Sequence, residues 1–332
     1  MSRKLILTCD LCPGDVVMMT AAVRDLHRAH SGLFLTDVRT PAAQLWENNP
    51  WITQLSEDDP EVTVVPMRYD LIHESNEGAY HFIHGYVRHL EDFLGLRIPV
   101  TRFRGDIYLS DLEKSWLNQV QEEPIGWNRD FWIVVAGGKH DYTTKWWDSA
   151  RYQQVIDHFA GRIQFVQCGE ANHHHPRLRG TIDLVGKTDV RQFVRLMYHA
   201  SGVLCPVTFA MHLAAAVEVK PGRPKNRACV VIAGGREPSQ WEKYGHHRFL
   251  ETNGALPCCD NGGCWKSRCQ PVGDGDEKDK PENLCVSPVA IASNLQIARC
   301  MDLITARDVI RAVELYHDGE ALQYLSGQPA AP

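Results

Sequence analysis

The hydrophobic positions between residues 182 and 219 change their period three times. A short apolar run gives way to apolar residues at helical spacing, and a second short run is followed by a helix of small residues. Strand, helix, strand and helix in this order are typical of a parallel α/β sheet. The pattern therefore predicts an α/β fold with the loop 206–210 leading into a helix N-terminus. The four segments are 182–185, 190–200, 203–205 and 211–217.

The same alternation continues on both sides of this stretch. We expect strands at 4–8, 33–38, 62–67, 69–73, 131–135, 163–168 and 228–233, and helices at 16–30, 41–48, 80–94, 111–121, 149–159 and 305–316. With 332 residues, 44% of them hydrophobic, the chain can bury a large core and form two domains. Pro124 and Gly126 indicate a linker between them. The prediction is two Rossmann-like domains, 1–121 and 122–320, with a disordered tail to residue 332.

The charge of the chain and the lengths of its apolar runs indicate which partners and which compartment to expect. The chain carries 35 Lys and Arg against 41 Asp and Glu, a net charge of -6, which gives no reason to expect binding to nucleic acid or acidic membranes. The apolar run at the N-terminus breaks at Cys9, too early for a signal peptide, and no stretch approaches the length of a transmembrane helix. We therefore predict a cytoplasmic protein. In the cytoplasm, cysteines serve as metal ligands, buried thiols or redox groups more often than they form disulfides, and this chain has eleven.

The loop 206–210 is a candidate phosphate site. A loop that enters a helix presents free backbone N–H groups and the positive end of the helix dipole. Thr208 adds a hydroxyl, and His212 in the first turn offers an imidazole for an anion. The alternative is that Thr208 only caps the helix and that His212 only packs against its neighbours.

Two further loops follow predicted strands. Gly14 and Asp15 lie between the first strand and its helix, without the G-x-G-x-x-G pattern of dinucleotide sites. The loop 136–147 holds two glycines and Lys145, and it is not a P-loop. From the residues alone, Asp15 is a helix-capping aspartate and Lys145 a solvated lysine ahead of an amphipathic helix.

These three loops carry a resemblance to a known family. The segment VTFAMHLAAA at 207–216 resembles the (D/T)-S-G-x-x-H-x-A-A-A segment of glycosyltransferase family 9, the bacterial heptosyltransferases. Gly14-Asp15, followed by Thr20-Ala21-Ala22, is similar to the family's G-D pair and T-x-A/P helix, and Lys145-Trp146-Trp147 is similar to its K-x-W segment. The chain departs from the family at Val207, where an acidic residue is usual, and at Phe209, which replaces glycine. The resemblance covers most of the chain and implies a GT-B fold, in which two Rossmann-like domains face each other across a cleft.

The resemblance also implies a reaction, the inverting transfer of a sugar from a nucleotide diphosphate to a hydroxyl group. Asp15 would be the general base that takes the acceptor proton, and Lys145 would stabilise the leaving diphosphate. By analogy the donor is ADP-heptose and the acceptor a lipopolysaccharide core sugar or a protein hydroxyl, with no catalytic divalent metal. The alternative is an inactive nucleotide-sugar binding protein or a metal-stabilised scaffold. The donor-binding residues implied are Gly14, Gly138, Thr144, Glu170, Thr208, Ala210, Met211, His212 and Arg236.

Six of the eleven cysteines lie in the polar segment 257–300. A long polar loop in a compact domain needs a source of order, and four thiolates around one ion would supply it. The segment resembles the iron-binding cysteine-rich finger of autotransporter heptosyltransferases. We expect a structural iron or zinc held by Cys258 or Cys259 together with Cys264, Cys285 and Cys300, leaving Cys269 free. The alternative is a flexible insertion with reduced thiols. A homo-oligomer is compatible with the sequence, which does not specify one.

Overall fold

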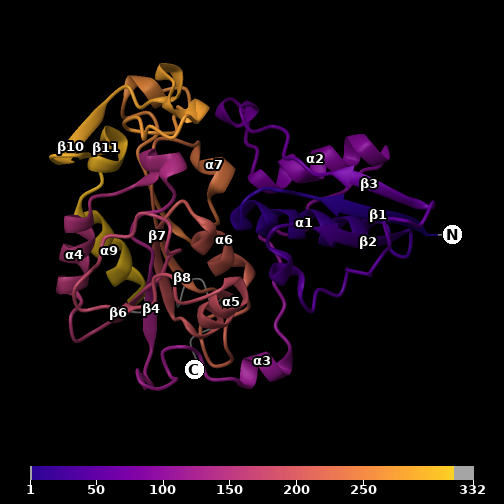
Figure 1. Ribbon diagram of the computed structural model, residues 1–332, viewed down its shortest axis with the longest axis horizontal. Coiled ribbons are helices and arrows are strands. Elements are labelled where there is room, and N and C mark those ends of the chain that lie inside the picture. The colour runs from indigo at the N-terminus through magenta and orange to yellow at the C-terminus, as the bar shows by residue number, and fades with distance from the viewer. Residues whose placement is uncertain (1, 318–332) are drawn as a thin grey trace, which may run out of the picture.

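The structure, a computed structural model, describes residues 2–317 and contains two parallel sheets. The first has the strand order β2-β1-β3 and the second the order β6-β5-β4-β7-β8-β9 (Figure 1). The predicted α/β class is confirmed. The expectation of a disordered tail falls on residues 318–332, outside the described part. The strands are β1 (Arg3–Thr8), β2 (Phe34–Arg39), β3 (Val62–Pro66), β4 (Phe131–Val134), β5 (Gln164–Gln167), β6 (Ile182–Asp183), β7 (Gly202–Pro206), β8 (Ala228–Gly234) and β9 (Arg248–Glu251).

Helices cover both sheets, and α1 and α6 meet between them (Figure 1). Nearly every side chain of α1 from Val16 to Leu26 is buried, since this helix packs against its own sheet, against α2 and against α6. The helices are α1 (Pro13–Ala29), α2 (Phe82–Leu94), α3 (Asp111–Ser115), α4 (Ser149–His158), α5 (Val190–His199), α6 (Phe209–Ala216), α7 (Ser239–Glu242), α8 (Arg299–Asp302) and α9 (Ala306–His317). The 3-10 turns include η1 (Ala43–Trp46), η2 (Glu74–Asn76) and η3 (His140–Lys145).

The order of the strands fixes where a ligand can bind. In the second sheet the chain begins at β4, moves outward through β5 and β6, and then returns to the other side of β4 with β7. In open α/β sheets, ligands bind at this reversal, outside the carboxyl ends of the strands. The loops after β4 and β7 lie there, and the loop after β1 holds the corresponding place in the first sheet. These loops contain the three predicted motifs.

One hydrophobic core runs through both halves of the chain. The ring of Phe82 in α2 stacks on Trp241 in α7, with centroids 5.1 Å apart. Asn76 in η2 accepts a hydrogen bond from Trp265 Nε1 at 2.8 Å and donates one to the Gly263 carbonyl at 3.0 Å. The first half is therefore joined to α7 and to the cysteine-rich segment by specific contacts. The domain boundary at residues 121–122 stays a prediction.

Three predictions differ from the structure: the strand at 69–73 is absent, the helix at 111–121 is shorter, and the helix at 41–48 is only the 3-10 turn η1. Residues 69–73 form no strand, because Tyr69 turns its ring onto Phe82 and Asp70 N donates to the Gly85 carbonyl at 3.3 Å. The helix predicted at 111–121 ends at Ser115. Its continuation is replaced by a turn in which the Asn118 side chain accepts from Val120 N at 2.9 Å, a local bond that competes with the helix.

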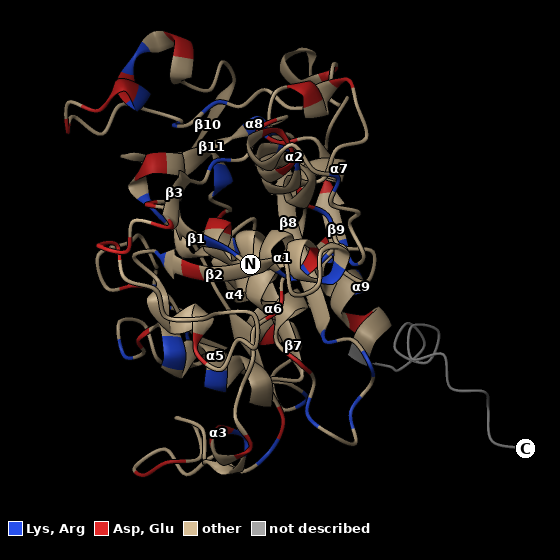
Figure 2. Cartoon of the chain, turned by 90° about the vertical axis from the view of Figure 1, so that its right-hand side faces the viewer, with Lys and Arg blue, Asp and Glu red and all other residues tan. Residues whose placement is uncertain are grey.

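The structure also contains elements that the sequence pattern did not predict. These are β9, α7, α8 and an antiparallel hairpin of β10 (Pro288–Ala292) and β11 (Leu295–Ala298) in the cysteine-rich segment. Basic and acidic residues are interspersed over both halves (Figure 2). Within residues 2–317, no helix is both long and apolar enough to span a membrane.

Candidate active site

The loop after β1 brings Asp15 to the start of α6. Gly14 packs so closely on α6 that a Cβ atom built on it would lie 3.2 Å from His212 Cδ2 and 3.5 Å from Phe209 Cα. Burial raises the pKa of the neighbouring Asp15 carboxyl to about 6, with Glu242 adding to the rise and the positive charges of His212 and Lys145 opposing it. Two motifs far apart in the sequence thus form one site, and its carboxylate titrates near neutral pH.

His212 is held by polar contacts on both ring nitrogens. Nδ1 lies 2.8 Å from the Tyr244 hydroxyl, and Nε2 lies 3.2 Å from a carboxylate oxygen of Glu242. The Tyr244 hydroxyl also lies 3.0 Å from Met18 Sδ in α1. All four side chains are buried. The imidazole is therefore fixed in orientation, with its Nε2 edge close to the Glu242 carboxylate.

Lys145 forms an ion pair with Glu237 in the loop after β8. Its Nζ lies 2.8 Å from Glu237 Oε1, which also pairs with Arg236. Burial alone would raise the pKa of Glu237, but Lys145 and Arg236 hold it below its ordinary value. The Tyr142 ring lies 4.7 Å from the Arg236 guanidinium and 5.6 Å from Lys145 Nζ. Two cations thus share one buried carboxylate, and Lys145 also acts on the nearby Asp15 carboxyl.

The start of α6 carries a free hydroxyl. Thr208 occupies the N-cap position with φ -149°, and within residues 2–317 its buried Oγ1 has no hydrogen-bond partner. The first N–H groups of a helix have no acceptor inside the helix, and those of Phe209 and Ala210 stand in this position. Met211 N donates to the Thr208 carbonyl at 3.1 Å. The turn therefore offers backbone and side-chain donors to an anion.

The other residues predicted to bind the sugar donor lie around this centre, and some of them are already engaged in bonds within the protein. Gly138 forms a backbone bridge with His174. The Thr144 hydroxyl already donates to the carbonyls of Lys266 and Ser267, so it anchors the cysteine-rich segment. Glu170 is exposed and lies 3.4 Å from His173 Nε2. The structure thus brings Lys145, His212 and Arg236 together and leaves the Glu170 side chain exposed.

Sequence reasoning missed several residues of the site. Glu237 follows Arg236 in a glycine loop after β8, next to β7 in the sheet, so its position was a usable signal. Glu242 and Tyr244 belong to no motif, and only the folded chain shows their contact with His212. Lys139 reaches across to the first half and lies 3.0 Å from Cys12 Sγ.

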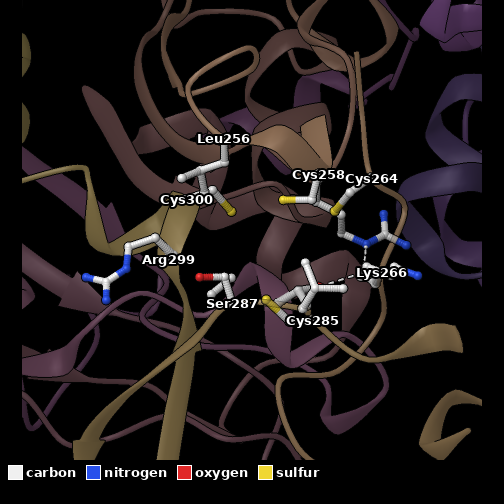
Figure 3. A pocket seen from close by; sticks show the side chains of 12 residues that line it. Leu256, Cys258, Cys264, Lys266, Cys285, Ser287, Arg299 and Cys300 are labelled. Carbon is white, nitrogen blue, oxygen red and sulfur yellow. Dashed lines mark hydrogen bonds between the residues drawn. The ribbon is translucent and has the colours of Figure 1, made fainter. Parts of the chain in front are cut away.

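Four cysteines line one small cavity in the cysteine-rich segment. Cys258, Cys264, Cys285 and Cys300 surround a volume of about 10 Å³, and Figure 3 shows their sulfur atoms facing the same space. Cys259 points elsewhere, with Sγ 3.4 Å from the Leu256 carbonyl and 3.7 Å from that of Thr252. Burial raises the pKa of Cys258 to about 11 and that of Cys300 to about 12, so both are protonated thiols here. The Cys269 thiol hydrogen-bonds Cys285 and lowers its pKa.

This lining has the chemistry of a thiolate metal site but not its assembled geometry. Within residues 2–317, no three His, Cys, Asp or Glu side chains are grouped closely enough to hold an ion. The cavity is about the size of one water probe, which suits a single ion. The residue types therefore fit a four-cysteine site, and the thiols would have to lose protons and move together to form it.

Comparison with known proteins gives one family match. The model of glycosyltransferase family 9 (heptosyltransferase) matches residues 72–221, which is less than half of the chain. No curated protein matches the sequence well enough to count as a relative. The matched part includes the loop after β4 and the start of α6 but not Asp15.

Solved structures match along almost the whole chain. The ADP-heptose LPS heptosyltransferase II of E. coli has a TM-score of 0.59 and 14% identity, over 96% of this chain and 99% of that one. A family 9 glycosyl transferase from Veillonella parvula has a TM-score of 0.62 and 15% identity, over 97% of each chain. The iron-containing dodecameric glycosyltransferase TibC of enterotoxigenic E. coli has a TM-score of 0.63 and 14% identity, over 96% of this chain and 77% of that one.

These similarities establish the fold and support a class of protein. The chain has the two-sheet α/β fold of the heptosyltransferases. Together with the family match, the structural neighbours support a glycosyltransferase.

Proposed function

We propose that this protein is an inverting glycosyltransferase that moves a sugar from a nucleotide diphosphate to a hydroxyl acceptor. The observation that carries the proposal is the contact of the Asp15 turn with the first turn of α6, where Gly14 meets His212. A carboxylate from one half of the chain thereby faces the anion-binding turn of the other half. A sugar between them would present its anomeric carbon to an acceptor on one side and its leaving diphosphate to the other.

Asp15 is the general base in this proposal. A base works best when its pKa lies close to the working pH, and burial has raised that of Asp15 to about 6. The carboxylate takes the proton of the acceptor hydroxyl as oxygen attacks the anomeric carbon. The bond between that carbon and the diphosphate oxygen breaks, and the nucleoside diphosphate leaves.

The diphosphate is bound by Lys145, Arg236 and the start of α6. Lys145 and Arg236 already share Glu237, so their combined charge is not fully neutralised. Thr208 Oγ1 and the free N–H groups of the first turn add hydrogen bonds, and fixed donors of this kind stabilise a developing anion. His212 supports the first turn of α6, with Glu242 and Tyr244 holding its ring. No divalent metal takes part in the proposed reaction.

The donor in this proposal is ADP-heptose. The TibC enzyme has been solved in complex with ADP-D-β-D-heptose, and its structure matches this chain with a TM-score of 0.60. The acceptor is a glycan or protein hydroxyl, and the compartment we propose is the cytoplasm. A homo-oligomer is part of the proposal, because TibC is described as a dodecamer.

A structural iron or zinc belongs to the same proposal. Cys258, Cys264, Cys285 and Cys300 would hold it, and Cys258 is preferred over Cys259 because only Cys258 lines the cavity. The ion would order the polar segment by joining parts of the chain that have little apolar surface. TibC, described as iron-containing, has the same fold.

A screen of nucleotide sugars tests the function. A ligand that binds only the folded state must raise its melting temperature, so ADP-heptose should stabilise the chain more than other nucleotide sugars do. Wild type should then release ADP from the stabilising donor, and Asp15→Ala should bind that donor without releasing ADP. Binding with no turnover in wild type, with any acceptor, would leave a binding protein instead of an enzyme.

A further inference from the structure

A second cavity lies at the other end of α6, where the two halves of the chain meet. It has a volume of about 230 Å³ and is lined by Arg104 of the first half and by the end of α6, the loop 217–227 and His246 of the second. Ile107 forms a backbone bridge with Val217, and a Cβ atom at Gly105 would lie 2.5 Å from the Val17 carbonyl. The chain next to Arg104 is therefore held in place by α1 through Val17 and by Val217, which follows α6.

The lining of this cavity is strongly basic in a protein whose net charge is -6. Among residues 2–317 its one lining carboxylate, Glu218, pairs with Lys114 at 2.7 Å, and Arg223 pairs with Asp130 at 2.6 Å. The remaining lining cations have no carboxylate within ion-pair distance in the described chain, residues 2–317. They are Arg104, Lys220, Lys225 and Arg227.

Arg227 shows that the cavity is built and not an accident of the surface. Its side chain is 2% exposed and donates to the carbonyls of Ala200, Ala214, Val217 and Glu218 at 3.0 to 3.2 Å. These bonds also cancel the negative end of the α6 dipole, which would otherwise repel an anion. A buried guanidinium without a carboxylate is costly, and its pKa falls to about 9 because of burial and the nearby Arg223.

His246, which also lines the cavity, is affected by the same positive charges. Burial, together with the positive charges of Arg104 and Arg227, lowers the pKa of His246 to about 4. His246 is therefore neutral at pH 7 and offers a hydrogen bond without adding charge. The cavity combines an uncompensated positive potential with fixed donors, and this combination selects an anion.

We propose that this cavity binds a phosphate or diphosphate group, at a site separate from the proposed donor site and independent of the proposed function. About 230 Å³ holds such a group with several waters but is below the roughly 300–1,000 Å³ of pockets that enclose whole drug-sized ligands. The bound anion contacts Arg104 from the first half and Lys220 and Lys225 from the second, beside the buried charge of Arg227. Binding therefore strengthens the contact between the halves.

Inorganic pyrophosphate is the probe for this site. We expect it to raise the melting temperature of wild type at constant ionic strength, set with chloride. Lys220→Glu/Lys225→Glu removes the basic rim at positions that are half-buried and exposed, so the fold is preserved. This variant should raise the dissociation constant for pyrophosphate at least tenfold. Arg104→Ala should do the same if its ligand-free melting temperature stays near that of wild type.

Matched controls separate this site from the donor site and from general charge effects. Arg162→Glu/Lys187→Glu makes the same charge change at exposed positions far from the cavity lining and should bind pyrophosphate as wild type does. Lys145→Ala should also retain this binding. Loss of binding in Lys145→Ala, with retention in Lys220→Glu/Lys225→Glu, would place the anion at the donor site and overturn the proposal. Equal losses in both glutamate variants would overturn it as well.

The source of the phosphate is distinguished in a second arm. Glucose 6-phosphate and inorganic phosphate are titrated separately, because one carries its phosphate on a sugar and the other is free. Tighter binding of the sugar phosphate, lost in Lys220→Glu/Lys225→Glu, indicates a phosphorylated glycan. Equal binding of both indicates a free phosphate as the ligand. Binding of neither, together with no response to pyrophosphate, would sink the proposal.

Discussion

Gly14 in α1 faces His212 in α6 so closely that a Cβ atom on Gly14 would lie 3.2 Å from His212 Cδ2. Few Cβ atoms in proteins make contacts this short. A side chain at residue 14 would therefore shift His212, and with it the alignment of the two helices that carry the proposed base and the proposed phosphate turn, by a few tenths of an ångström.

Gly14→Ala should accordingly push α1 and α6 apart by a few tenths of an ångström. We expect turnover to fall at least tenfold, because small displacements of reacting groups are costly, and stability to drop by about 1–3 kcal/mol from overpacking. Urea unfolding and steady-state assays measure the two effects. Gly245→Ala is the matched control, since a Cβ there would meet nothing within 4 Å. Full activity in Gly14→Ala would contradict the proposed alignment.

Asp15→Asn should remove activity and, at neutral pH, stabilise the protein. The pKa of Asp15 rises from 3.8 to about 6 on folding, so between these values the folded chain keeps a proton that the unfolded chain has lost. The free energy of unfolding therefore falls as the pH rises through this range. At pH 7.5 the asparagine avoids this penalty, a gain on the order of 2 kcal/mol that should shrink as the pH is lowered toward 4. Denaturant unfolding at several pH values checks the sign.

The same carboxyl sets the pH profile of the wild-type enzyme. Only ionised Asp15 accepts the acceptor proton, so kcat/KM should rise with pH and level off above about 6. A rate that is independent of pH between 5 and 7, with chemistry limiting, would remove Asp15 from the role of base.

Lys145→Ala should weaken binding of the diphosphate without unfolding the site. Glu237 keeps Arg236 as a partner, so its buried carboxylate is not left unpaired. A charged hydrogen bond to phosphate contributes roughly 1.5–3 kcal/mol, so we expect the dissociation constant for ADP to rise by about 10- to 100-fold. Adenosine, which lacks phosphates, is the control ligand and should bind both forms equally. Calorimetric titration distinguishes these cases.

The cysteine cavity predicts about one iron or zinc per chain. Cys264→Ser and Cys285→Ser should lower metal content and melting temperature together, because thiolate ligation is coupled to the order of the segment. Cys259→Ser is the matched control, since its sulfur faces backbone carbonyls and does not line the cavity. EDTA should leave the initial turnover of intact protein unchanged. Freshly purified protein without a transition metal in elemental analysis would rule the site out.

The sequence was informative where a motif follows a strand. Strand, glycine and helix around Gly14 predicted β1 and α1, and the loops with Lys145 and Thr208 follow β4 and β7 at the reversal of the strand order. Periodicity reports such local units well, because each buries one face of a single element. The wrong strand at 69–73 shows the limit of this argument, since the half-buried Tyr69 packs on Phe82 of α2 and not on a strand neighbour.

The rest of the site depends on contacts between distant segments. Lys145 and Glu237 belong to different loops, and Glu242 and Tyr244 reach His212 only after α7 has packed. The basic cavity behind α6 combines Arg104 with a loop more than a hundred residues later in the chain. No spacing rule in a single sequence connects such residues, because their distance is set by the packing of the whole fold.

The stack of Phe82 on Trp241 has a consequence for how the chain is made on the ribosome. Domains tend to fold as they emerge, with the N-terminal part first. Here the apolar face of α2 is completed only when Trp241 has been synthesised. The hydrogen bond between Asn76 and Trp265 forms later still, once the cysteine-rich segment has been made. The nascent first half therefore carries a partly uncovered aromatic surface until Trp241 has been synthesised. Early release of a truncated chain would expose this surface to aggregation and proteolysis.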